Sequence, residues 1–326
     1  MGGRAIIPLI GREAERLDIK TRNGIISNLS DINALIPVRE IKEKKDFGDI
    51  DFLFSDDIPR HIVLNRIISI MKDDGFTYNG QVPNDNVYSL AFNNYQIDII
   101  FINSIHKDTS YYYFADNDRG NLVGSIYHKL NFNYGHQGLF IKLENTKILL
   151  SLDTEKILQF LNCDRLFIDK VLKYGFDTFE EMYHDITQIP YFSSEYFKFE
   201  NLNNQNRTRN SKRNTFINFI KFLEGKTFND PISYPEYMKF KALSFFNKEK
   251  EYIELLKTIE KNKVIRKNID GNLISQITGL KEKKLGEFVI YFKEKNSDII
   301  ENPGIFTENQ IIERIKDDFK FFSKNT

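Results

Sequence analysis

The residues of this chain best suited to chemistry are three aspartates, each beside an apolar run. Asp49 and Asp51 are separated by one residue and lead into such a run. If residues 49–54 form a strand, its period of two places both carboxylates on the same face of a sheet. Asp98 lies inside Tyr95–Ile102, where apolar neighbours make an unpaired charge costly. The pattern predicts a site where carboxylates converge and something offsets their repulsion.

A divalent cation is the simplest partner for such a cluster. Mg²⁺ and Mn²⁺ bind carboxylate oxygens, and three acids on two adjacent strands suit a two-metal site that transfers nucleotidyl groups. Asp-x-Asp pairs are also common as solvated turn residues or strand-edge charges, so Asp49 and Asp51 alone leave that interpretation open. Asp98 within its hydrophobic strand favours the metal site.

Composition limits the classes of protein that this chain can belong to. Its 326 residues are enough for two domains of roughly 150 residues each. With 41% hydrophobic residues, 29 Phe and 16 Tyr, a packed core is expected and global disorder is not. The 46 basic and 46 acidic residues cancel, so any surface for nucleic acid must be local. Cys163 is the only cysteine, which excludes an internal disulfide and a multi-cysteine zinc site.

The same composition bears on location. No apolar run approaches the ~18–20 residues of a membrane span, and the first residues lack the form of a signal peptide. The single cysteine fits a reducing compartment. We therefore expect a soluble cytoplasmic protein. Heavy use of Ile, Asn and Lys suggests an AT-rich genome such as that of a virus or phage, and a viral protein would then act in the host cytoplasm.

The elements that must position the acids can also be predicted. A strand is expected at 49–54, and apolar residues at helical spacing from Ile62 to Met71 predict a helix after it. Two β-rich runs, Val87–Phe92 and Tyr95–Ile102, are joined by Asn93-Asn94, which favours a hairpin. The first half therefore predicts a small mixed sheet backed by helices.

Further along, an aromatic cluster precedes a helix. Tyr111–Phe114 is interpreted as a half-buried strand in preference to a surface for stacking on bases. A helix is expected from about Leu122 to Leu130. Its Lys129 could hold a triphosphate, or be one surface lysine among many. His128 and His136 lack a partner at metal-ligand spacing, so they are not expected to bind zinc.

From about Ser151 onward helical patterns dominate, which predicts a domain boundary near residue 150. Within this region a polar stretch, 201–213, carries four positive charges in seven residues, with Phe216 and Phe219 just beyond. A basic run beside aromatic residues is typical of a nucleic-acid surface, although a solvated face is the alternative. The four cations are Arg207, Arg209, Lys212 and Arg213.

The acidic motif resembles a known superfamily. Gly48-Asp49-Ile50-Asp51, followed by a third acid in a later strand, resembles the DNA polymerase β-like nucleotidyltransferases. In that superfamily a glycine-containing helix lies upstream of the acidic strand, and Gly2-Gly3 sits where the glycine pair could belong. The block from Asn117 to Leu139 is similar to predicted nucleotidyltransferases of large DNA viruses and phages.

A segment near the C-terminus has a resemblance of its own. Asp270–Ile274, Thr278–Leu280 and Lys284–Phe288 resemble part of the tRNA nucleotidyltransferase and bacterial poly(A) polymerase family, where a glycine-punctuated helical module helps to hold RNA. Lys281-Glu282-Lys283 replaces the family's Pro-Gly-Pro-like centre. The alternative is two short helices with glycine caps.

Together these resemblances imply an α+β protein. A small mixed-sheet nucleotidyltransferase head with helices would occupy residues 1–150, and a mainly helical region that binds nucleic acid or another acceptor would occupy 151–326. The implied activity is metal-dependent, template-independent transfer from an NTP, such as ATP, to an RNA 3′ end of a tRNA or an mRNA tail. Asp49, Asp51 and Asp98 would bind Mg²⁺ or Mn²⁺, with Asp98 also holding the attacking hydroxyl in line.

Other residues receive supporting roles under this interpretation. Phosphates would be bound by Gly2, Gly3, Gly48 and Lys129, and RNA by Arg207, Arg209, Lys212 and Arg213. Two alternatives stay open: the acceptor could be a protein or small molecule, or the chain could be a catalytically inactive RNA-binding subunit. The base that is added, the acceptor and the oligomeric state cannot be predicted from the sequence.

Overall fold

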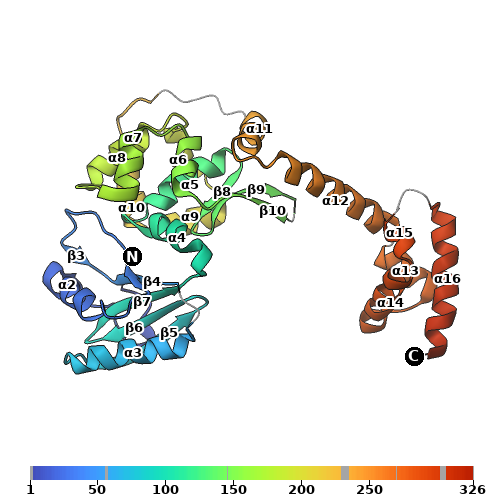
Figure 1. Cartoon of the computed structure of the whole chain (residues 1–326), viewed down its shortest axis with the longest axis horizontal. Coiled ribbons are helices and arrows are strands. Elements are labelled where there is room, and N and C mark those ends of the chain that lie inside the picture. Colours follow the sequence, from blue (N-terminus) through green and yellow to red (C-terminus); the bar gives the residue numbers. More distant parts are fainter. Residues whose placement is uncertain are drawn as a thin grey trace. The chain divides into compact units, whose positions relative to one another are not determined.

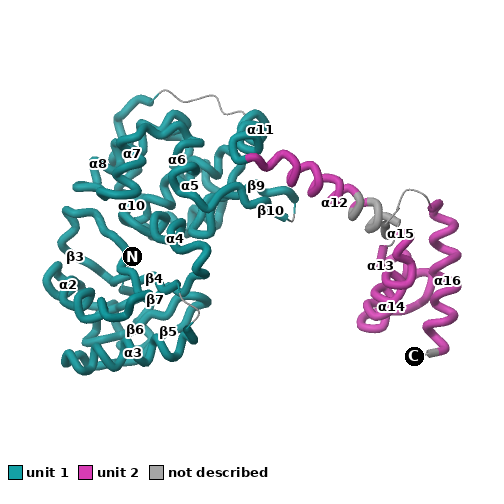
Figure 2. The backbone as a smooth tube through the Cα atoms, viewed as in Figure 1, with its two compact units in different colours: residues 1–246 teal, residues 247–326 magenta. Residues whose placement is uncertain are grey.

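A computed structural model describes residues 3–55, 58–144, 146–228, 235–268, 270–301 and 306–325. The chain divides into two compact units, residues 1–246 and 247–326 (Figure 2). This division follows residue 246, whereas the change in sequence character suggested a boundary near 150. The roles assigned to 1–150 and 151–326 stay predictions.

The first unit is built on a five-stranded mixed sheet with strand order β2-β4-β7-β6-β5 (Figure 1). Strands β4 and β7 run parallel, and the other neighbours are antiparallel. The predicted strand 49–54 and both hairpin strands are confirmed. Asn93 and Asn94 have φ of 48° and 68°, as a tight hairpin turn requires. The strands are β2 (Leu35–Pro37), β4 (Ile50–Phe54), β5 (Tyr78–Asn84), β6 (Val87–Phe92) and β7 (Tyr95–Phe101).

Two helices, α2 (Ile19–Asn28) and α3 (Arg60–Asp73), bury the apolar face of this sheet. Alternate residues of β4 and β7, such as Phe52 and Ile99, point into that core. Side chains between them, the aspartates included, must point to the opposite face. Most of the predicted apolar stripe of α3 is buried, with Ile67 fully enclosed, but Ile62 at its start is 50% exposed and Ile68 is half-buried. Short elements precede and flank the sheet: α1 (Ile7–Ile10), β1 (Leu17–Asp18) and β3 (Asp46–Phe47).

The rest of the first unit is mainly helical, with one small antiparallel sheet of order β10-β9-β8. Figure 1 shows this part beyond the sheet face that α2 and α3 leave free. Its elements are η1 (Ser104–His106), α4 (Lys107–Phe114), α5 (Arg119–Lys129), β8 (Phe132–Gly135), β9 (Gly138–Leu143), β10 (Thr146–Ser151), α6 (Thr154–Phe160), α7 (Arg165–Asp169), η2 (Lys170–Tyr174), α8 (Phe179–Thr187), η3 (Ser194–Tyr196), η4 (Phe199–Asn201), α9 (Asn204–Asn210), α10 (Asn214–Leu223) and α11 (Pro235–Phe245).

One local prediction was wrong. Tyr111–Phe114, expected as a strand, forms the last turns of α4. Tyr113 packs edge-on against Tyr134 of β8, with ring centroids 5.5 Å apart. Aromatic residues favour strands because their rings pack well on a pleated surface, but tertiary packing overrides that preference. Here a helical turn allows Tyr113 and its neighbours to pack against different elements.

The second unit contains helices only among its described residues. A separate apolar core includes Ile274, Phe288, Phe292 and Ile315. Gly279 ends α13 in the left-handed conformation, φ 71°, and its N–H bonds to Ser275 O, as expected of a glycine cap. The helices are α12 (Glu249–Asn268), α13 (Gly271–Thr278), α14 (Glu282–Lys295), α15 (Ser297–Glu301) and α16 (Glu308–Asn325).

The architecture confirms the predicted α+β class: mixed sheets with helices come first and helices dominate afterwards. Among the helices of the described ranges, none combines the length and apolar character needed to cross a membrane.

Candidate metal centre

Strand pairing brings the three aspartates together. Asp51 and Asp98 are direct partners across the parallel β4–β7 pair, and Asp49 lies two residues before Asp51 on the same face. One carboxylate oxygen of each lies within 4.8 Å of the others, and all three residues are partly buried. Because divalent cations bind clustered carboxylates, this arrangement fits a metal centre.

The environment of the cluster penalises negative charge. Burial raises the pKa of Asp49 and Asp51 above the ordinary aspartate value, and at Asp51 the charges of the other two aspartates add to it. Burial, with the charge of Asp49, raises the pKa of Asp98 to about 7. Three like charges with little solvent between them need a counter-charge, which a bound cation supplies.

Two cationic side chains already lie near the acids. Lys44 forms an ion pair with Glu40 at 2.9 Å, and its charge is the main influence that lowers the pKa of Asp49 against burial. Arg22 donates to Val38 O at 3.2 Å, and its Nε is buried without a hydrogen-bond partner among the described residues. Burial lowers the pKa of Arg22, while the charges of Glu40 and Asp51 raise it. The cluster therefore has a cationic border.

Gln96 orients Asp98. Its side-chain amide donates to both carboxylate oxygens of Asp98, at 3.0 and 2.9 Å, and its carbonyl accepts from Ala5 N–H at 3.0 Å. Gln96 is only 2% exposed, so the amide is held in place by its surroundings. Ser89, the strand partner of Asp98 on β6, also bonds to the carboxylate, and these contacts oppose the rise in its pKa. Gln96 thus links the N-terminal segment to the acidic cluster.

We expect Gln96→Leu to weaken Mn²⁺ binding by about tenfold to a hundredfold, the usual effect of losing a partner that orients a metal ligand. The substitution removes both donors to Asp98 and leaves Ala5 N–H without its acceptor. Calorimetric titration with Mn²⁺ measures the change. Gln81→Leu, on the exposed edge strand β5, is the matched control and should leave the affinity unchanged. Equal affinities for wild type and Gln96→Leu would show that Gln96 does not orient the ligand.

Without metal, the folded protein should lose stability as the pH rises. Below about pH 4 Asp98 is protonated in both the folded and unfolded states. Between that value and its folded pKa of about 7, only the folded state holds the proton. The free energy of unfolding therefore falls across this window, by up to about 4 kcal/mol from this residue.

Urea unfolding in EDTA at about pH 5 and about pH 8 measures this effect. Asp98→Asn cannot ionise, so the variant should be the more stable protein at the higher pH and gain little at the lower one. Mg²⁺ should stabilise wild type more than the variant. A difference between the two proteins that does not change with pH would contradict the expectation.

Gly3 and Gly48, expected to approach phosphates, lie against each other. A β-carbon on Gly3, whose φ is 92°, would lie 2.9 Å from Gly48 O, so only glycine fits this contact. Gly3 O also accepts from Ala14 N–H at 2.7 Å. The N-terminal segment therefore packs directly beside the residue that precedes Asp49. Gly2 lies outside the described residues.

A turn before α5 connects the basic stretch to the acids. Asp116, Asn117 and Asp118 all have left-handed backbone conformations, with φ of 52–60°. Asp118 pairs with Arg213, and its charge is one of those that raise the pKa of Asp49. Arg213 is thus the member of the basic stretch that the fold brings toward the aspartates.

The other predicted binding residues have different surroundings. Arg207 donates to two backbone carbonyls, Phe199 O and Leu202 O, each at 3.1 Å. Lys212 is exposed. Lys129 donates to Asn201 O at 3.0 Å and, with Arg209, lines a pocket that none of the three aspartates borders. The predicted nucleic-acid residues therefore differ in their contacts, and their role stays a prediction.

Sequence reasoning missed three residues of the site: Gln96, Arg22 and Lys44. Gln96 precedes Asp98 by two positions, so strand period places both on one face, and this signal was available. Lys44 belongs to a run of charged residues, and such a run predicts a solvent-exposed surface. Arg22 has no local signal, because only tertiary packing brings α2 to the acidic strand.

No protein-family model matches the sequence, and no curated protein matches it. Among solved structures, the chain is similar to polymerase β of Leishmania infantum in a ternary P/T complex and in a ternary gap complex. Both likenesses have 12% sequence identity and a TM-score of 0.32 and cover 42% of this chain. The chain matches 62% and 55% of the two polymerase chains, less than two thirds of either. Any functional assignment therefore has to come from the acidic cluster itself.

Proposed function

We propose that this protein is a metal-dependent nucleotidyltransferase that adds nucleotides from an NTP to the 3′ end of an RNA, without a template. The observation that carries the proposal is the convergence of Asp49, Asp51 and Asp98 on one sheet face, with carboxylate oxygens within 4.8 Å of one another. Burial makes the negative charges of the three acids costly, and a bound cation would offset that cost.

The three aspartates would have different roles in the proposed reaction. Asp49 and Asp51 would hold Mg²⁺ or Mn²⁺ where the triphosphate binds, and Asp98, held by Gln96, would face the acceptor hydroxyl. The bound metal would supply charge neutralisation and a lower pKa for that hydroxyl. The protein's own contribution is orientation and electrostatic stabilisation, which is what transfer of phosphorus-centred groups chiefly demands.

Cationic side chains would neutralise the rest of the triphosphate. Arg22 and Lys44 lie beside the acids, and Arg22 Nε has no hydrogen-bond partner among the described residues. A buried donor without a partner is costly, so an anionic oxygen placed there would relieve the cost. The contact between Gly3 and Gly48 would hold the N-terminal segment beside the acidic strand.

Incubation with each labelled NTP, Mg²⁺ or Mn²⁺ and a mixture of small RNAs tests the proposal. We expect RNA extension that disappears in the Asp49→Ala, Asp51→Ala double variant. The same gel identifies the base that is added. The absence of both extension and metal-dependent nucleotide binding would overturn the proposal and favour an inactive RNA-binding subunit.

The basic stretch distinguishes an RNA acceptor from a protein or small molecule. Replacing both Arg209 and Lys212 with alanine should cripple transfer to RNA, because each removes a charge available to phosphate. The same variant should transfer normally to a protein acceptor. Label on protein, unaffected by this double variant, would move the proposal to a modifying enzyme.

A further inference from the structure

We infer that the pocket between α5, β8 and α9 binds one nucleotide of a single-stranded nucleic acid, its base together with the phosphates on either side. The inference rests on the proposed function only in its choice of an RNA strand as the ligand. The pocket has a volume of about 280 Å³, just below the ~300–1,000 Å³ range of small-molecule sites.

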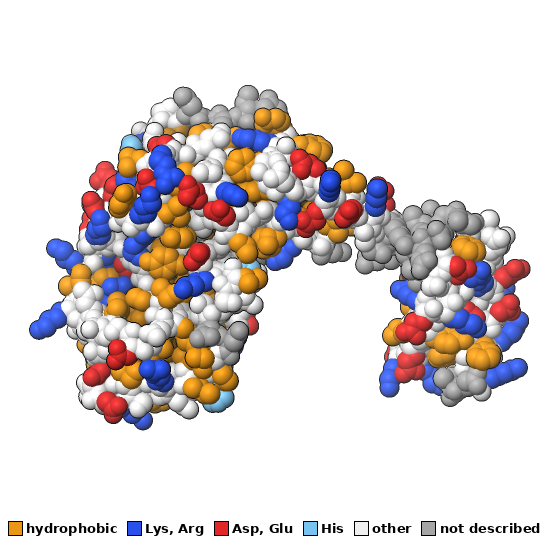
Figure 3. All heavy atoms as spheres, in the orientation of Figure 1, with side chains coloured by type: hydrophobic (Ala, Val, Ile, Leu, Met, Phe, Trp, Pro, Cys, Tyr) orange, Lys and Arg blue, Asp and Glu red, His pale blue; other side chains and the backbone are white. Residues whose placement is uncertain are grey.

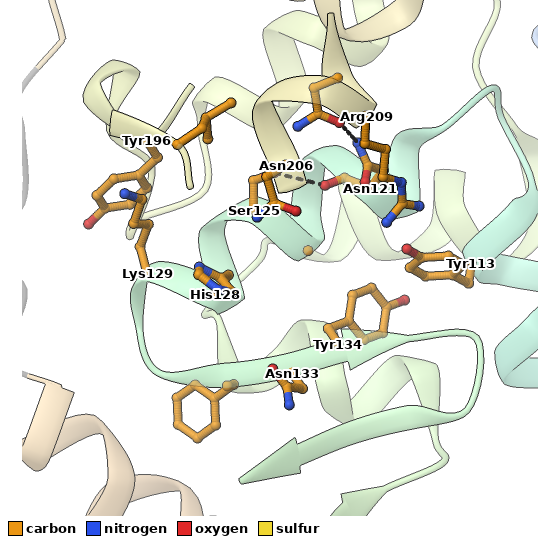
Figure 4. Close-up of a pocket in the computed structure, with 14 residues that line it drawn as sticks. Tyr113, Asn121, Ser125, His128, Lys129, Asn133, Tyr134, Tyr196, Asn206 and Arg209 are labelled. Atoms are coloured by element: carbon orange, nitrogen blue, oxygen red, sulfur yellow. Dashed lines mark hydrogen bonds between the residues drawn. The ribbon is translucent and has the colours of Figure 1, made fainter. Parts of the chain in front are cut away.

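The pocket follows one face of α5. Asn121, Ser125, His128 and Lys129 recur at the three- and four-residue spacing that aligns side chains along a helix, and all line the pocket. From Asn121 to Lys129 the axial rise is about 12 Å, long enough for a nucleotide. Figure 4 shows Lys129 and Tyr196 at one end of the pocket and Arg209 with Tyr113 at the other.

The positively charged residues that line the pocket favour an anionic ligand. Lys129 and Arg209 both line the pocket, and among the residues that the structure describes no carboxylate does so. The charges of Lys129 and Lys142, after burial, lower the pKa of His128, which indicates a positive local environment. Over the face of the molecule in Figure 3, basic and acidic side chains are intermixed. Because the 46 basic and 46 acidic residues of the chain cancel, attraction for a polyanion must come from local features such as this pocket.

Arg209 is free to take a ligand. Within the described ranges its guanidinium has no hydrogen bond or ion pair, in contrast to Arg207 and Arg213 of the same basic stretch. Lys129 uses one of its three donors on Asn201 O and keeps two. Both cations can therefore bind phosphate oxygens without breaking an existing ion pair.

The remaining lining suits a base. Asparagine side chains offer donors and acceptors together, and Asn121, Asn133 and Asn206 all reach the pocket. Tyr113 and Tyr134 supply aromatic rings at one end, and the Tyr134 hydroxyl is buried with no hydrogen-bond partner among the described residues. Aromatic rings beside amides and cations are the features with which proteins bind single-stranded nucleic acid.

Fluorescence anisotropy with a labelled single-stranded RNA of about twelve nucleotides, in EDTA, tests the inference without any catalysis. We expect Arg209→Ala and Lys129→Ala each to weaken binding about tenfold. Each should also reduce the slope of log affinity against log salt by about 0.7, the value for one lost phosphate contact on a single strand. Arg66→Ala and Lys221→Ala, exposed residues away from the pocket, should change neither quantity.

A variant that adds a negative charge to the pocket provides a second test of RNA binding, and this test removes no cationic side chain. Asn206→Asp places a carboxylate in the pocket and should weaken RNA binding as well. If the Arg209 and Lys129 variants behave like the Arg66 and Lys221 controls, the inference is wrong. Adenosine 5′-monophosphate that binds as tightly as the RNA and displaces it would also overturn it, because the site would then belong to a free nucleotide.

The proposed function can fail separately. The Asp49→Ala, Asp51→Ala variant should bind RNA normally in EDTA, since the aspartates do not line the pocket. RNA binding that depends on Arg209, in a protein without transferase activity, would support RNA binding in this pocket. The same result would contradict the proposed nucleotidyltransferase function.

Discussion

Replacing Asp49 with alanine, or Asp98 with asparagine, is expected to reduce nucleotidyl transfer by at least about a thousandfold, or about 4 kcal/mol of transition-state stabilisation. Each change removes one of three carboxylates whose oxygens lie within 4.8 Å of one another. The remaining two acids cannot offer the same set of ligands to a cation. Extension of labelled RNA by purified variants at saturating Mg²⁺ measures the loss.

Stability should change in the opposite direction from activity. Because burial raises the pKa of all three acids, the folded protein without metal carries unfavourable charge near pH 7. Removing one acid relieves part of this repulsion, so the metal-free variants should melt at or above the wild-type temperature.

Asp46→Asn is the matched control. This carboxylate is exposed, lies close to Asp49 in sequence and pairs with Arg16. We expect it to retain nearly full activity. Near-normal activity in Asp49→Ala or Asp98→Asn would refute the assignment of the acids, and a folded, inactive protein is the result that supports it.

Replacing Asp116 with asparagine should destabilise the first unit by about 3–5 kcal/mol, the cost of leaving a buried charge without its partner. Asp116 is fully buried and accepts two hydrogen bonds from Arg39, at 2.9 and 2.8 Å. Arg119, also fully buried, donates to the same carboxylate at 3.3 Å. An amide in its place would leave two guanidinium groups facing a neutral side chain.

The network holds separate parts of the first unit together. Arg39 follows strand β2 of the main sheet, and besides Asp116 it donates to Val171 O at 2.8 Å. Asp116 belongs to the turn that leads into α5. Loss of its charge should therefore loosen the contact between the sheet that carries the acids and the helices that carry the pocket.

Urea unfolding followed by far-UV circular dichroism measures the change. Asp169→Asn is a suitable comparison, because Asp169 also has two cationic partners, but these, Arg165 and Lys173, are more than half exposed. Exposed pairs contribute about 0–1 kcal/mol, so this variant should be nearly neutral. Equal effects at Asp116 and Asp169 would mean that the buried network contributes no more than a surface pair.

Local pattern was enough to predict the three acids and three strands of the sheet, β4, β6 and β7, but not β2 or β5. Residues 49–54 and 95–102 are rich in strand-forming residues, and Asn93-Asn94 lies between two β-rich runs, so strands and a hairpin can be predicted from neighbours in sequence. The helices of the second half followed from their own apolar spacing. These features depend on neighbours in sequence, which is why the pattern was sufficient.

Where the pattern was ambiguous, packing decided. Tyr111–Phe114 has residues that suit a strand, yet they complete α4 because Tyr113 packs on Tyr134. In the same way, the sequence predicts that the basic stretch forms one surface patch. In the fold Arg207 binds backbone carbonyls, Arg213 pairs with Asp118 and Arg209 lines a pocket.

The sequence by itself therefore determined the α+β class and which residue types could bind a metal. Only the tertiary structure decided that Asp51 and Asp98 are strand partners, that Arg22 and Lys44 lie beside them, and that Lys129 joins Arg209 in a separate pocket. The physical reason is the range of the interactions. Strands and helices follow from side-chain periodicity over a few residues, whereas a site depends on contacts between segments far apart in the chain, and these follow from the packing of the whole unit.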